Sequence, residues 1–266
     1  MSSTTTAARA RTASTPAGRL RSLARAELTL LMRNRTTLFM ALAMPPFMVA
    51  AIWSSMDRVN LADTGLTAGG MVMTGGIGMV LLLVVYANLV AAFVARREER
   101  VLKRLRTGEV PDREILAGTA LPSVALALTQ CVLLVLAGAV LLDLTAPQRP
   151  GLLLAGVVLG VVMMVLLAVA TTAFTRTVEA AQITALPLLM VSAVGSGLFV
   201  PFELLPDQTA AVLRLLPLSP VMELVRYGWL GGLDGTETLR ALGLAVAWTA
   251  LAVFAVRRWF RWEPRQ

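Results

Sequence analysis

The sequence predicts an all-α polytopic membrane protein with six transmembrane helices. Hydrophobic residues make up 57% of its 266 residues and charged residues only 15%, which lies outside the usual proportions of a soluble domain. Runs of about twenty apolar residues recur, and a helix of that length crosses the hydrocarbon core while satisfying its own backbone hydrogen bonds. The predicted spans cover residues 37–56, 70–95, 118–142, 151–174, 180–202 and 239–256, the last being the shortest.

Two regions precede the first span. Residues 1–18 are rich in Ser, Thr, Ala and Arg and are expected to be a disordered tail, so that residues 19–266 form a single transmembrane domain. Between the tail and the span, leucines at helical spacing alternate with arginines, which predicts an amphipathic helix lying in the membrane interface. The alternative for this stretch is a plain cytoplasmic anchor.

The basic residues are distributed unevenly around the predicted spans. If the connecting segments alternate between the two sides, 19 of the 24 Lys and Arg residues fall on one side. The positive-inside rule then places both termini in the cytoplasm, and an even number of spans agrees. This distribution explains the net charge of +8 without a nucleic-acid partner. With 23 arginines and one lysine, the composition indicates a bacterial cytoplasmic membrane.

Several activities are excluded by residues that the sequence lacks. Without histidine there is no Ser-His hydrolase, no His-dependent acyltransferase and no His-ligated zinc site. The phosphate-binding pattern GxxxxGK[ST] is also missing, so we expect no ATPase site, no cofactor and no catalytic residue in this chain. All sixteen acidic residues fall in loops, tails or span edges, which disfavours an ion-coupled transporter.

The segment between the second and third spans, ARREERVLKRLRTGEVPDREILAG, is the most informative one. From Arg97 it is predicted to be helical, with apolar residues on one face and basic residues around the rest, until Gly108 and Pro111 break it. Asp112 is a candidate N-cap for the next helix. One interpretation is a cytoplasmic loop whose arginines contact anionic lipid headgroups.

The order of residues in this segment resembles the ABC-2 type permeases of ABC transporters. Those proteins carry a "RE…LKRLR" helix followed by a turn and a glutamate, and the helix docks on the nucleotide-binding subunit. The resemblance implies that the ATPase-coupling residues are Glu98, Glu99, Lys103, Arg104 and Arg106.

A second block resembles the same family. From Ser196 to Trp229, four prolines divide an apolar stretch into pieces too short to span, which predicts two short re-entrant helices on the outer side. The family shows "GLFFP…LP…L…NPL…R" here, although Ser219 stands where asparagine is common. The residues that mark this block are Pro201, Pro206, Pro217, Pro220 and Arg226.

Few polar residues lie inside the predicted spans. They either form hydrogen bonds between helices or line a transport pathway, and the candidates are Asn88, Gln130, Thr184 and Ser192. Gly156 and Gly160 form a GxxxG pattern that permits close helix contact, a weak signal for dimerisation.

The resemblance implies the permease subunit of an ATP-driven exporter. Two permease copies, expected to be a homodimer, would work with two ABC ATPase subunits that bind ATP and Mg²⁺. The apolar spans favour an amphipathic or hydrophobic substrate such as a drug, an antibiotic or a lipid-like molecule, as in efflux-based drug resistance. The alternatives are a non-transporting sensor, anchor or assembly component, and an ion-coupled secondary transporter.

The six-span arrangement makes a prediction about topology. A reporter that is active only in the cytoplasm should be active when fused to the C-terminus. The positive-inside rule places the C-terminus on the cytoplasmic side, together with the arginine-rich segment, residues 97–107. A C-terminal fusion that is active only outside the cytoplasm would contradict the span count.

Overall fold

The computed structural model describes residues 67–99, 112–141, 146–198, 205–232 and 234–260, together with residue 202 and single positions at 25, 29, 39, 43, 47, 50 and 54. Within these ranges the chain consists of helices and turns, without strands, so the predicted all-α class is confirmed. The helices are α3 (Ala68–Val80), η1 (Leu81–Ala87), α4 (Asn88–Glu98), α6 (Asp112–Leu141), α7 (Pro150–Thr172), α8 (Val178–Gly195), α9 (Asp207–Leu213), α10 (Ser219–Leu230) and α11 (Gly235–Trp259).

Five of the described helical stretches are long and apolar enough to cross a membrane. The first is continuous through α3, η1 and α4, and the others are α6, α7, α8 and α11. They correspond to the second to sixth spans of the prediction. The first predicted span, 37–56, and the interfacial helix before it fall outside the described ranges, apart from the single positions given above.

The fifth predicted span, 180–202, is too long at its C-terminal end. Helix α8 stops at Gly195, where even a Cβ atom would lie 2.0 Å from Leu216. Gly197 follows with a φ of 67°, a left-handed conformation that suits glycine and reverses the chain. The turn comes before the prolines on which the sequence argument relied.

The sixth predicted span, 239–256, is too short, and it is not the shortest. Helix α11 has 25 residues, compared with 18 in α8. It begins earlier because the Asp234 side chain accepts a hydrogen bond from the backbone N–H of Glu237 at 2.7 Å, a standard N-cap. A hydropathy window cannot detect this start, because the polar first turn lies outside the apolar stretch.

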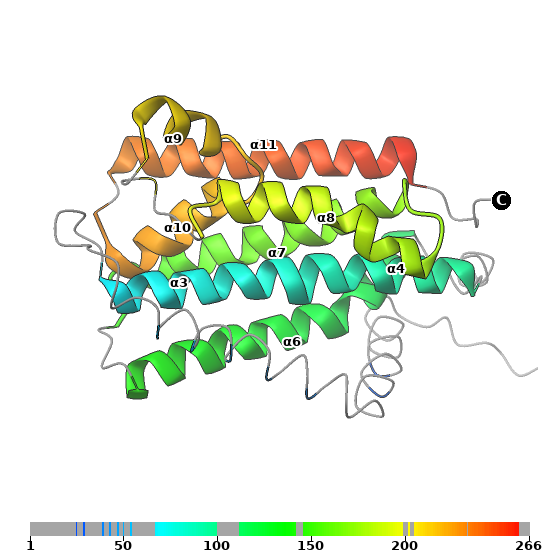
Figure 1. The fold of residues 1–266 in the computed structure, drawn as a ribbon, viewed down its shortest axis with the longest axis horizontal. Helices are drawn as coiled ribbons and strands as arrows, with labels where there is room; N and C mark the ends of the chain where they lie inside the picture. Colours follow the sequence, from blue (N-terminus) through cyan, green and yellow to red (C-terminus); the bar gives the residue numbers. More distant parts are fainter. Residues whose placement is uncertain are drawn as a thin grey trace, which may run out of the picture.

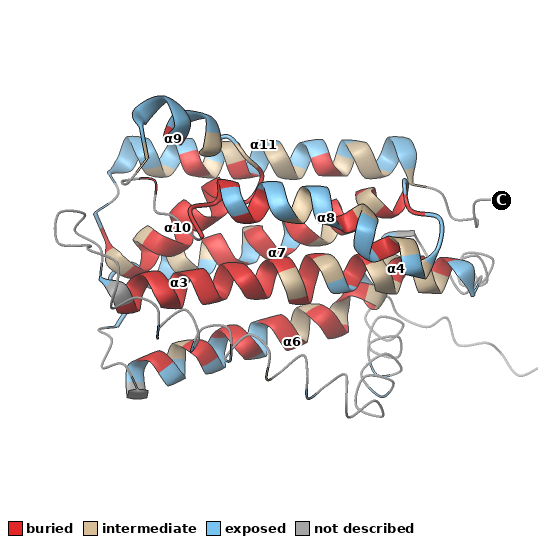
Figure 2. Ribbon diagram, in the orientation of Figure 1, coloured by how far each residue is buried: buried red, intermediate tan, exposed pale blue. Residues whose placement is uncertain are grey.

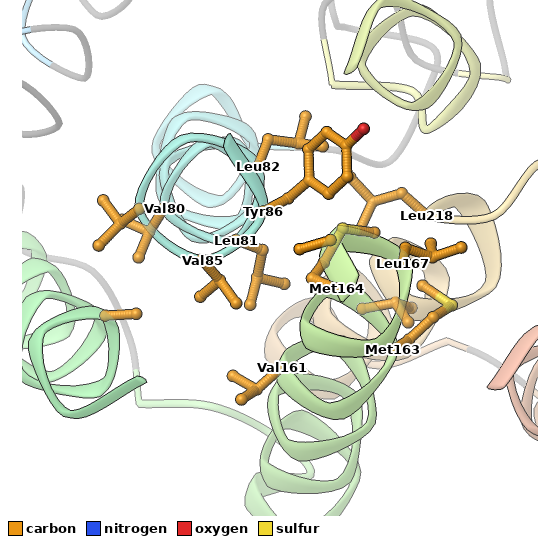
Figure 3. Packing of buried hydrophobic residues seen from close by; sticks show 14 of the residues in the cluster. Val80, Leu81, Leu82, Val85, Tyr86, Val161, Met163, Met164, Leu167 and Leu218 are labelled. Carbon is orange, nitrogen blue, oxygen red and sulfur yellow. The ribbon is translucent and has the colours of Figure 1, made fainter. Parts of the chain in front are cut away.

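The long helices run side by side, and α7 lies among α4, η1, α10 and α11 (Figure 1). Side chains of η1 and α7 interdigitate in the core, among them Leu81, Val161 and Met164 (Figure 3). Helices α3 and α10 are largely buried, whereas α8, α9 and α11 have many exposed residues (Figure 2). The exposed positions of α11 include Leu251 and Phe254, as expected for a surface that contacts acyl chains.

Helix α10 is too short to span the membrane, yet it packs closely against α7 through glycines. Gly156 and Gly160 of the GxxxG pattern face Val225 and Val221 of α10, where added Cβ atoms would lie 3.0 Å and 2.8 Å from the valine methyl carbons. Gly228 of α10 faces the backbone of α7 in turn. The GxxxG pattern therefore serves a contact within the chain.

This contact makes a prediction about stability. A Cβ atom at Gly228 would lie 2.5 Å from the backbone nitrogen of Leu153, which cannot move aside as a flexible side chain could. Gly228→Ala should therefore cost about 1–3 kcal/mol, the range found for overpacked cores, and lower the thermal unfolding midpoint in detergent. Gly151→Ala at the start of α7 is the control, because its Cβ would have no atom within 4 Å. Equal midpoints for the two variants would contradict the proposed close contact.

Candidate functional site

One end of the bundle gathers the end of α4, the turn between α7 and α8, and the end of α11 (Figure 1). The rings of Phe174 and Trp259 lie 6.0 Å apart there, which ties the turn to α11. The arginine-rich segment begins at the same end, as α4 stops. The first candidate site is therefore the junction between that segment and the bundle.

Arg97 is the central side chain of this junction. It is 1% exposed, and its guanidinium group donates hydrogen bonds to the backbone carbonyl oxygens of Thr172, at 2.7 Å, and of Thr175. Thr172 is the last residue of α7, where the last turn has no partners within the helix and the helix dipole is negative, and Thr175 lies in the turn that follows. A buried cation at this position supplies hydrogen-bond donors to these carbonyls and a positive charge at the negative end of the helix dipole.

Glu98, the next residue, contacts the next helix. Its carboxylate accepts a hydrogen bond from the backbone N–H of Val178, the first residue of α8, at 3.2 Å. The Thr177 side chain accepts from Ala180 in the same turn. Glu98 thus places a negative charge at the positive end of α8.

Arg97 and Glu98 together hold both helix ends of the turn between α7 and α8. We call this group the α7–α8 joint, comprising Arg97, Glu98, Thr172, Thr175 and Val178. The two adjacent residues carry opposite charges, and each lies at the helix end of complementary polarity. Helix α4 is therefore fixed to α7 and α8 at its C-terminal end.

Arg97 is helical, as predicted, but it does not lie on a polar helix surface with the other basic residues. Arg97 belongs to the last turn of α4 and is buried, because the end of α7 lies beside it. The sequence contains no signal that separates Arg97 from Arg96. Only the position of α7 does so.

The other predicted coupling residues are distributed as follows. Glu99 is the exposed C-cap residue of α4 and forms an ion pair of 3.4 Å with Arg96. Lys103, Arg104 and Arg106 lie outside the described residues. Both glutamates are exposed, but they differ in their partners, because Glu98 accepts a hydrogen bond from α8 and Glu99 pairs with Arg96 of its own helix.

The predicted polar residues within the spans are found on three helices. Asn88 of α4 is exposed and donates to Ser123 of α6 at 3.2 Å, while Thr184 of α8 donates to a carbonyl of its own helix. Gln130 of α6 and Ser192 of α8 are buried. The bonds of Asn88 and Thr184 thus go to other residues, and do not join the four candidates into one polar cluster.

Tyr86 is a polar residue that the sequence analysis missed. It lies in η1, where the helix widens to π geometry, a distortion that is frequent at functional sites. Its hydroxyl is 3.1 Å from the Thr171 hydroxyl of α7 and donates to the Ala185 carbonyl of α8 at 3.3 Å. The signal available was a phenol in an apolar span, because a buried tyrosine hydroxyl needs a partner.

At the opposite end, the proline-rich block forms the two short helices α9 and α10, as predicted, with α10 buried rather than superficial. Arg226 is 2% exposed and donates to the Gly197 carbonyl at 2.6 Å, with its guanidinium 5.9 Å from the Phe202 ring centre. Ser219 lies within hydrogen-bonding distance of the carbonyls of Gly195, at 2.7 Å, and Leu213, at 2.6 Å. The serine hydroxyl therefore joins α8 and α9 to α10.

The prolines of this block have separate roles. Pro206 immediately precedes α9, and Pro220 is in the first turn of α10, where a missing N–H costs nothing. Pro217 is buried in the turn between these helices. Pro201 falls outside the described residues.

A charged group lies beside these helices. The Glu223 carboxylate of α10 is 3.4 Å from both Arg214 and Arg240. Burial raises the pKa of Glu223 above its usual value, and the nearby Arg240 and Arg214 oppose this shift. The group holds α10 against the start of α11.

The described helices define a multi-pass α-helical membrane protein with two short helices, α9 and α10, at one end of the bundle. A family model described as ABC-2 family transporter protein matches residues 35–257. The chain belongs to the ABC-2 transporter family, whose members are the membrane components of ABC systems and work with a separate ATPase subunit. A comparison with curated proteins finds no match.

The α7–α8 joint predicts how Arg97 contributes to stability. Arg97→Met keeps an apolar stem but leaves the end of α7 without its donors, so stability should fall by about 1.5–3 kcal/mol, the usual range for a hydrogen bond to a charged group. The thermal unfolding midpoint in detergent measures this. Arg96→Met, one residue earlier and more exposed, should change the midpoint little. Similar midpoints for the two variants would contradict the capping role.

Proposed function

We propose that this chain is the permease subunit of an ATP-driven exporter in the bacterial cytoplasmic membrane, with both termini in the cytoplasm. Two copies form the membrane unit, and each contacts an ABC ATPase subunit that binds ATP and Mg²⁺. The cargo is an amphipathic or hydrophobic compound of the drug, antibiotic or lipid-like kind. Family membership and the apolar character of the spans support this proposal.

The observation that carries the proposal is the α7–α8 joint. The arginine-rich segment, residues 97–107, is the part that would contact the ATPase subunit, and its first two residues hold the ends of α7 and α8. A displacement of the segment would therefore move α4, α7 and α8 together. Because α7 also packs against α10, the same movement would reach the opposite end of the bundle.

The two glutamates have different roles in this mechanism. Glu99 is exposed, forms its ion pair at the end of its own helix, and would contact the ATPase subunit together with Lys103, Arg104 and Arg106. Glu98 binds the N–H of Val178 and would transmit movement within the permease. Binding and transmission should therefore be separable by mutation.

The test uses the permease reconstituted with its ABC ATPase subunit in lipid vesicles. Glu99→Ala should reduce recovery of the complex at least fivefold, because a charge in a protein interface loses much when its partner is removed. Glu98→Ala should leave the complex intact but lower transport per ATP hydrolysed. Glu98→Gln retains an acceptor for Val178 and should behave like the unaltered protein. The permease without its ATPase subunit should show no ATP turnover.

Contact with lipid headgroups predicts a different result. Each basic residue would then contribute about 1 kcal/mol regardless of order, and removing both glutamates would strengthen the contact or leave it unchanged. Normal efflux and full recovery of the complex in the Glu98→Ala/Glu99→Ala variant, with the same result after neutralising Lys103 and Arg104, would overturn the coupling role.

A further inference from the structure

A groove of about 560 Å³ lies between α9 and the first half of α11. Helix α9 lies alongside that part of α11 at the end of the bundle opposite the α7–α8 joint (Figure 1). Charged and apolar side chains line the groove together, including Asp207, Arg214, Leu215, Leu239 and Arg240. Such a lining suits a ligand that is itself both polar and apolar.

The two arginines share one buried carboxylate. Arg214 and Arg240 are each 3.4 Å from the same oxygen of Glu223, whose side chain is 5% exposed. The arginine side chains are 33% and 52% exposed, and both arginines line the groove. A guanidinium group has five N–H donors and binds phosphate oxygens with matching geometry. The groove can therefore offer donors of both arginines to one phosphate.

A carboxylate lies in the same groove. Asp207 is the first residue of α9 and Arg214 directly follows its last residue, so they are seven residues and two helical turns apart. They thus lie on the same side of the helix, with about 10 Å between their positions along the axis. The groove accordingly presents positive and negative groups in sequence, which complements a ligand that carries an anion followed by a cation.

The apolar rim indicates where the ligand comes from. Leu215 and Leu239 are 59% and 70% exposed, and Val212 of α9 is 63% exposed. An exposed apolar surface rimmed by polar residues is typical of a site that interacts with a membrane or another protein. Trp248 donates from its ring nitrogen to the Leu215 carbonyl at 2.8 Å, which holds the end of α9 against α11. A membrane lipid reaches this groove more readily than a soluble molecule does.

We propose that the groove binds a phospholipid whose headgroup joins a phosphate to a primary ammonium. The phosphate lies against Arg214 and Arg240, the ammonium faces Asp207, and one acyl chain follows Leu215 and Leu239. Such a lipid would brace α9 against α11 in the membrane leaflet at this end of the bundle. The site is independent of which compound the transporter exports.

The test measures lipid binding to the purified permease–ATPase complex by native mass spectrometry. The probes are phosphatidylethanolamine, phosphatidylglycerol and diacylglycerol with identical acyl chains. Phosphatidylethanolamine should bind at least tenfold more tightly than diacylglycerol, which lacks the phosphate, and more tightly than phosphatidylglycerol, which lacks the ammonium. Equal binding of phosphatidylethanolamine and either other lipid would overturn the proposal.

Three variants locate the site without disturbing the Glu223 ion pairs. Gly243 lines the groove and a Cβ there has no atom within 4 Å, so Gly243→Leu should fill the groove and weaken phosphatidylethanolamine binding at least tenfold. Gly235→Leu is the matched control, because it has equal space on the same helix outside the groove lining. Asp207→Asn should abolish the preference for phosphatidylethanolamine over phosphatidylglycerol. Unchanged binding in Gly243→Leu, or an unchanged preference in Asp207→Asn, would overturn the assignment.

Discussion

The structure depends on polar side chains that pair with backbone groups at the ends of its helices. The first N–H groups and last carbonyls of a helix have no partners within it, and leaving them unpaired in an apolar environment costs several kcal/mol each. Arg97 and Glu98 meet this need for the end of α7 and the start of α8. Arg226 and Ser219 meet it beyond the end of α8. Polar side chains at both ends of the bundle thereby pair with the backbone groups at these helix ends.

The charged side chains fall into two kinds, those that hold helices in place and those that another molecule can reach. Arg97 and Arg226 are among the largest fully buried side chains, and each donates to backbone carbonyls. They bear on function through the helices that they fix, since burial keeps them from direct contact with a partner subunit. Glu99, Arg214 and Arg240 have exposed side chains that another molecule can reach. Arg97 and Arg226 can be buried because they pair with backbone groups near helix ends. Glu99, Arg214 and Arg240 are candidates for binding because another molecule can reach them.

Close packing connects the two ends of the molecule. Glycines of α7 and α10 allow these helices to approach until side chains meet backbone, and η1 packs on another side of α7. Closely packed cores transmit displacement because they have little free volume. Within the described residues, α7 thus contacts Arg97 at one end of the bundle and α10 at the other.

Local properties of the sequence determined the class of protein and the approximate spans, because hydropathy and helix length act within one stretch of chain. The prolines around 206–220 likewise predicted two short helices, since proline limits the backbone wherever it occurs. Tertiary structure alone decided that Arg97 is buried while Arg96 is not, that Tyr86 joins three helices, and that Gly156 and Gly160 face α10. It also ended α8 at Gly195 and brought Asp207, Arg214 and Arg240 to one groove. Each of these features depends on which helix lies next to which, and residues far apart in the sequence carry no local signal of that neighbour.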